Sequence, residues 1–94
     1  MHVHNPGFYK DITRRVRAMR ARIGANVHAA RLQRGVTMER LARLSGLPPR
    51  VIDHIELGKG ETDLHHLTAL AVVLRVDVAT LLSPPPIVPE RRLG

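Results

Sequence analysis

The sequence predicts a small all-α protein built from five helices, and three observations support this fold class. Apolar residues recur every three or four positions, as on one face of a helix, and no segment alternates convincingly as a strand would. Glycines, prolines and short polar residues, which start and stop helices, separate these stretches. The length of 94 residues, 44% of them hydrophobic, suits one compact domain rather than two.

The first helix is expected to be long, spanning roughly residues 11 to 33 either as one helix or as two helices joined near Gly24. At 100° per residue its apolar positions fall within an arc of about 80°. They are Ile12, Val16, Met19, Ile23, Val27 and Ala30. Pro6 and Gly7 precede this stripe, and Gly35 is expected to end the helix.

Two short helices follow. Thr37 is placed to cap the second helix, and Gly46 can take the left-handed conformation that stops it. Pro49 suits the first turn of a third helix, which Gly58 and Gly60 close.

Two further helices and a tail complete the chain. Asp63 is expected to cap the fourth helix and Asp77 the fifth. Residues 83–94 hold four prolines and predict an extended, polyproline-like or disordered tail.

The net charge of +7 predicts an anionic partner, because arginine, which makes up all but two of the basic residues, suits forked contacts with phosphate. The excess of positive charge lies entirely in the first 34 residues, where Asp11 is the single acid. The basic residues of this segment are Lys10, Arg14, Arg15, Arg17, Arg20, Arg22, Arg31 and Arg34.

Several classes of protein are disfavoured. Without cysteine there is no disulfide, no zinc–cysteine site and no thiol nucleophile, and a reducing compartment is the default. No apolar run approaches the roughly 20 residues that span a bilayer, and residues 1–10 lack the apolar core of a signal peptide. We therefore expect a soluble, cytoplasmic protein with no membrane partner.

Metal binding and catalysis are also disfavoured. The six histidines lack the spacing of a metal site, and the adjacent His65 and His66 point about 100° apart on a helix. Asp53 and His54 combine an acid with a base, but neighbours on one helix face different ways. We expect no metal, no cofactor and no catalytic residue, and hence not an enzyme.

The predicted helices, with Ala42-x-x-x-Gly46 in a tight helix-turn-helix, resemble the phage lambda repressor and Cro type of DNA-binding domain, the Xre family. The matching positions are Ile23-Gly24, Ala30-Arg31, Gly35, Thr37, Leu41-Ala42, Gly46-Leu47, Ile52, Ile55-Glu56-x-Gly58, Leu64, Leu67, Ala71, Leu74 and Leu81. This resemblance covers residues 23–82, which leaves residues 1–22 as a basic, partly helical extension and 83–94 as the tail.

The resemblance implies that the third helix enters the DNA major groove while the second crosses the backbone. The implied reading surface is Pro49, Arg50, Val51, Asp53 and His54. Arg50 is the best candidate for a bidentate contact to guanine, and His54 is the second. The residues implied at or near the DNA backbone are Thr37, Met38, Arg40, Arg43 and Lys59, where Met38 stands in place of the glutamine of many relatives.

The resemblance also implies a structural ion pair between Arg31 of the first helix and Glu56 of the third. The part of the first helix that precedes the family domain carries Ile12, Val16 and Met19, which need a cover. We expect the same helix of a second subunit to bury them, making a homodimer; the alternative is that residues 9–22 fold back onto the fifth helix.

These features predict a sequence-specific DNA-binding regulator, most simply a repressor that occupies a palindromic operator as a homodimer. One alternative is an antitoxin that binds a protein toxin through residues 1–22 or the tail and represses its own operon. Another is a protein-interaction module on the same fold, in which Met38, Pro48 and Asp53 have weakened the DNA surface.

Overall fold

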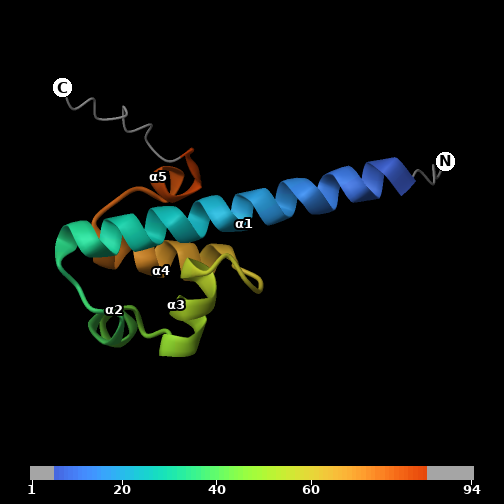
Figure 1. Cartoon of the computed structure of the whole chain (residues 1–94). Helices are drawn as coiled ribbons and strands as arrows, with labels where there is room; N and C mark the ends of the chain where they lie inside the picture. The colour runs from blue at the N-terminus through green and yellow to red at the C-terminus, as the bar shows by residue number, and fades with distance from the viewer. Residues whose placement is uncertain (1–5, 85–94) are drawn as a thin grey trace, which may run out of the picture.

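The computed structural model describes residues 6–84, and all its regular elements are helices (Figure 1). They are α1 (Pro6–Arg34), α2 (Met38–Ser45), α3 (Pro49–Glu56), α4 (Leu64–Leu74) and α5 (Val78–Leu82). This five-helix, all-α architecture confirms the predicted fold class. Over the same residues no helix is long and apolar enough to cross a membrane. The tail expected at 83–94 lies, from residue 85 onward, outside the described residues.

α1 is one continuous helix that projects well beyond the other four (Figure 1). It begins at Pro6 rather than near residue 11, because proline fits the first position of a helix, where an N–H group would have no partner in any case. It does not break at Gly24, and residues 9–22 do not fold back onto α5. The two-helix and fold-back alternatives were therefore wrong for this structure.

The core is aliphatic and lies between α1 and the four shorter helices. Six of its side chains are almost completely shielded from solvent: Val27, Leu41, Ile52, Leu70, Leu74 and Leu81. Every helix contributes at least one of them, so each helix is anchored by the apolar surface that it removes from water.

The ends of the four shorter helices follow the predicted signals with one exception. Thr37 Oγ1 accepts the backbone N–H of Arg40 at 3.1 Å, and Asp63 accepts that of His66 at 2.8 Å. Asp77 occupies the capping position of α5, but its side chain makes no capping hydrogen bond. The amide that it would accept, that of Thr80, is already bonded to the carbonyl of Asp77 at 2.9 Å.

A buried asparagine attaches α5 to α1. Asn26 Nδ2 donates to the carbonyl oxygens of Leu81 at 2.9 Å and Ser83 at 2.7 Å, near the end of α5. The last carbonyls of a helix have no partner within it, so this amide satisfies groups that would otherwise be buried without one. This role of Asn26 was not predicted from the sequence, where its signal is a polar residue three positions after Ile23, at the edge of the apolar stripe.

α1 and α3 approach each other so closely that only glycine fits at their contact. A Cβ atom at Gly24 would lie 2.7 Å from the carbonyl oxygen of Glu56 and closer still to that of Ile55. The backbone of α1 therefore rests directly on the carboxyl end of α3, and this contact sets the position of α3.

We predict that Gly24→Ala destabilises the protein by about 1 to 3 kcal/mol, because the added methyl group overpacks a contact with backbone atoms. The matched control is Gly7→Ala in the exposed first turn of the same helix, where alanine is expected to be neutral or slightly stabilising. Urea unfolding measures both variants. A stabilising Gly24→Ala substitution would contradict the close approach.

Candidate nucleic-acid interface

α2 and α3 form a compact pair joined by a short turn. α2 buries Leu41 and Ala42 and α3 buries Ile52 against the same core, so each presents its opposite face to solvent. Gly46 adopts a left-handed conformation with φ of 76°, and the buried Leu47 holds the turn against the core. Ala42 is buried in this pair, and its small side chain permits close packing of the two helices.

The outward face of α3 carries most of the residues expected to read bases. Pro49, Arg50, Asp53 and His54 are exposed, whereas Val51 is half-buried and packs against the core. α3 begins at Pro49 on the side of the molecule remote from α1 (Figure 1). Its exposed amino end therefore carries a guanidinium group and, one turn later, an imidazole and a carboxylate.

α2 carries most of the residues expected at the DNA backbone, from its capping residue Thr37 to Arg43 in its last turn. Arg40 and Arg43 are exposed, and Met38 is half-buried against the core. Because Thr37 uses its hydroxyl to cap α2, the amino end of this helix is fixed in place with its positive dipole directed outward. Such an end favours an anion such as phosphate.

Lys59 lies just beyond α3, and its side chain is exposed. Its backbone N–H donates to the carbonyl oxygen of His54 at 2.8 Å, and Gly58 makes the turn with φ of 72°. These contacts hold the Lys59 backbone against the carboxyl end of α3.

Glu56, at the end of α3, is held by two residues of α1. Arg31 Nε lies 2.6 Å from Glu56 Oε2 and Arg31 Nη2 lies 3.0 Å from Oε1, which makes a bidentate pair. The side chains are 12% and 6% exposed. His28 Nδ1 lies 2.8 Å from Glu56 Oε1, a contact that sequence analysis missed although His28 and Arg31 are three residues apart on one helix. Arg31 also donates to the carbonyl of Val36 at 3.1 Å, so one side chain links α1, the segment before α2, and α3.

The electrostatics of this cluster favour the charged pair. Burial alone would raise the pKa of the Glu56 carboxyl, but hydrogen bonds from Arg31 and His28 outweigh it and hold the pKa below its ordinary value. The same bond to Glu56 raises the pKa of Arg31. The carboxylate is thus ionised at neutral pH and occupied by structural partners rather than turned toward a ligand.

The three residues expected at a dimer interface lie on the projecting part of α1. Ile12 is 41% exposed, Val16 38% and Met19 45%. Val16 and Met19 also border a groove whose far side is formed by Leu67 and Leu82. The apolar stripe therefore continues from the free part of α1 onto the core of the domain.

Comparison with known proteins identifies the family to which this arrangement of helices belongs. The helix-turn-helix family model matches residues 27–81, more than half of the chain. A hypothetical transcription factor from Neisseria, NHTF, is 30% identical, with a TM-score of 0.68 over 71% of this chain and 77% of that one.

Two further solved structures are similar. The restriction-modification controller protein C.AhdI of Aeromonas hydrophila is 28% identical, with a TM-score of 0.65 over 68% of this chain and 97% of that one. The clp gene regulator ClgR of Corynebacterium glutamicum is 30% identical, with a TM-score of 0.65 over 68% of each chain. A comparison with curated protein sequences found no match.

We predict that Arg31→Met and Glu56→Gln each cost about 3 to 5 kcal/mol of unfolding free energy, because each leaves a mostly buried partner unpaired. The double variant should lose less than the sum of the two. Urea unfolding at pH 7 measures all three, and Arg15→Met, which removes an exposed partner of Asp11, serves as the control at well under 1 kcal/mol. Additive losses would show that the two side chains are not energetically coupled.

Proposed function

The chain belongs to the Xre, lambda-repressor-like family of helix-turn-helix proteins and is a DNA-binding transcriptional regulator, and we propose that it acts as a homodimeric repressor on a palindromic operator. The observation that carries the proposal is the outward face of α3, where Arg50 and His54 are exposed while the opposite face is locked into the core. A recognition helix needs this combination of open side chains and a fixed backbone.

In this proposal α3 contacts the bases, and neighbouring residues of α2 and the segment after α3 contact the DNA backbone. The guanidinium of Arg50 matches the two acceptors that guanine presents in the major groove, and Asp53 on the same face can accept from the amino group of cytosine. Arg40, Arg43 and Lys59 provide exposed charges for phosphates, which set register without reading sequence. The partly buried Val51 and Met38 can offer at most an edge of their apolar surface.

Dimerisation follows from the exposed stripe of α1. An antiparallel pair of α1 helices centred near Val16 buries Ile12 and Met19 of both subunits. Two-fold symmetry then presents two copies of α3 to half-sites about one DNA turn apart, roughly 34 Å. Repression requires only that such a dimer occupy DNA that the polymerase needs.

We predict that Arg50 and Lys59 contribute to DNA binding in different ways. Against an operator selected from a random DNA pool, Arg50→Ala should cost about 1 to 3 kcal/mol and relax the preference at one guanine. Lys59→Ala should weaken binding to all sequences alike and lower the salt slope by about one ion. Binding titrations at several salt concentrations, on the selected and on random duplexes, measure both effects. If Arg50→Ala weakens specific and random DNA equally, Arg50 does not read a base.

We also predict that Ile12→Gln combined with Val16→Gln converts a dimer into a monomer, because it removes apolar surface that the partner would cover. Sedimentation of the full chain measures the change. Thr13→Gln combined with Ala18→Gln, on other exposed faces of the same helix, should remain dimeric. A monomeric wild-type chain would contradict the dimer and would indicate that a different protein, such as a toxin, buries the apolar stripe.

A further inference from the structure

The projecting part of α1, residues 6–22, carries a second stripe that the helix-turn-helix does not explain. Lys10, Arg14 and Arg17 occupy successive turns and fall within an arc of about 60°. The centre of this basic stripe lies about 160° around the helix from the apolar stripe. A partner that covers the apolar stripe therefore leaves the basic stripe open. The whole of this part precedes the residues that the family model matches.

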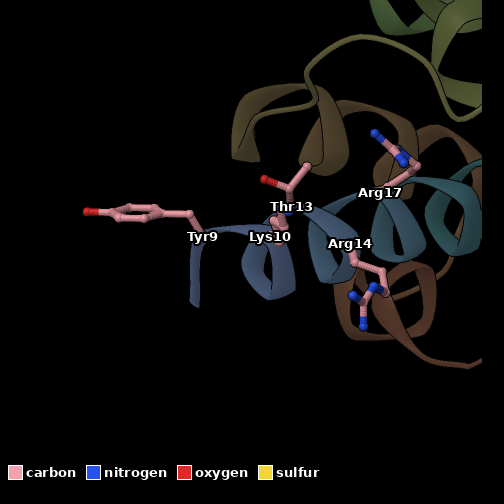
Figure 2. Close-up of a pocket in the computed structure, with 5 residues that line it drawn as sticks. All are labelled: Tyr9, Lys10, Thr13, Arg14 and Arg17. Atoms are coloured by element: carbon pink, nitrogen blue, oxygen red, sulfur yellow. The ribbon is translucent and has the colours of Figure 1, made fainter. Parts of the chain in front are cut away.

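Figure 2 shows the basic stripe at close range. Lys10 lies between Arg14 and Arg17, whose guanidinium groups spread to either side of it, and Thr13 is beside them. Among residues 6–84 neither Lys10 nor Arg17 has an ion-pair partner, and the exposed Arg14 reaches Asp11 only at 3.9 Å. The stripe thus offers three solvated cations and a hydroxyl group, and Asp11, which lies closer to Arg15 than to Arg14, neutralises them only weakly.

The basic stripe faces the same side of α1 as α3. Ala21, Gly24 and His28 continue its direction along the helix. All three lie at the carboxyl end of α3: Gly24 rests on its last carbonyls, His28 contacts Glu56, and a Cβ at Gly58 would lie 3.1 Å from Ala21 Cα. A duplex bound along the amino end of α3 would therefore run on the side of α1 that carries the basic stripe.

The stripe also lies within reach of such a duplex. α3 has eight residues, which is about 12 Å of helix, and the major groove is about 8.5 Å deep. If α3 points straight at the groove floor, its carboxyl end and the part of α1 at Gly24 stand on the order of 4 Å above the groove rim, and Arg17 lies seven residues, about 10 Å, further along α1. An arginine side chain, with three methylene groups and a guanidinium, can bridge that gap to phosphate. Lys59 follows α3 in the segment that passes beneath α1 (Figure 1) and extends the same positive side.

We propose that Lys10, Arg14 and Arg17 bind phosphates of the same DNA duplex that α3 reads, beyond the contact made by the helix-turn-helix itself. This inference rests on the DNA-binding role proposed above and adds a separate backbone site to it. The site is independent of sequence, because phosphates carry no base information, so it supplies affinity and orients the long helix along the duplex.

The test exploits a matched pair of double variants. Arg14→Gln with Arg17→Gln removes one weak partner of Asp11 and one unpaired cation from the basic stripe. Arg15→Gln with Arg22→Gln removes the other partner of Asp11 and one further cation from a different face of the same helix. Both variants lower the net charge by two and keep good helix formers, and circular dichroism checks that the helix is intact.

The probe is a 40-base-pair duplex of random sequence, titrated with the full chain at several salt concentrations. Each phosphate contact adds about 0.9 to the slope of log affinity against log salt, so losing Arg14 and Arg17 should lower the slope by about 1.8 per subunit. The Arg15 and Arg22 variant should keep most of its slope, and Arg14→Lys with Arg17→Lys should restore it.

Three results would overturn the proposal. Equal slopes for the two glutamine variants would show that charge acts only at long range, with no phosphate site on this face. If the Arg14 and Arg17 variant keeps the wild-type salt slope on DNA but no longer binds poly-glutamate, the basic stripe binds an acidic protein instead of DNA. Failure of the wild-type chain to bind any duplex would overturn the DNA-binding role itself, which the first two results leave standing.

Discussion

The arrangement of this molecule depends on one contact, where the carboxyl end of α3 meets the middle of α1. Gly24 lets the two backbones approach to a distance that no side chain permits, and Glu56 is held there by Arg31 and His28. Glycine permits the close approach and the ion pair orients the two helices, so α3 is fixed at its carboxyl end. Its amino end is then free to carry side chains chosen for what they bind rather than for packing.

α1 packs directly against α3, α4 and α5, whereas α2 packs against α3 and α4. Asn26 holds the end of α5 on one side, while Gly24 and Arg31 hold α3 on another. The projecting residues 6–22 would form only a marginal helix alone, since nucleation is costly. Here they extend a helix already formed by packing, so they add turns without a new nucleus. The projecting stripes therefore keep a defined direction relative to α3.

This geometry explains why the positive charge lies outside the helix-turn-helix. The domain itself is almost neutral, with Asp53 on the exposed face of α3 and Glu39 in the first turn of α2. In the proposed DNA-binding role, attraction to the polyanion comes from the arginine-rich α1, whose opposite face is apolar. In the proposed dimer, this one helix joins two subunits and binds the backbone of their shared duplex.

The sequence by itself determined the class of fold, the helix order and most helix ends, because these depend on local signals: the period of apolar residues, a threonine or aspartate at a cap, a glycine at a left-handed turn. It also identified Arg31 and Glu56, through resemblance to a family, and the exposed residues of α3. Two local predictions were wrong. The side chain of Asp77 does not cap α5, because the backbone carbonyl of Asp77 already accepts the N–H of Thr80. The start of α1 was predicted near residue 11, whereas the helix begins at Pro6, a residue that the first position of a helix accepts.

Only the tertiary structure decided what Gly24, Asn26 and His28 do. Nothing within one helix distinguishes a glycine that meets another backbone from one that merely weakens the helix, or a buried asparagine from an exposed one. The partners of these residues lie about 30 to 60 positions away along the chain, at the ends of α3 and α5. The same holds for the basic stripe. The sequence places Lys10, Arg14 and Arg17 on one face of a helix, but only the packing of α1 against α3 determines that this face lies on the same side of α1 as α3.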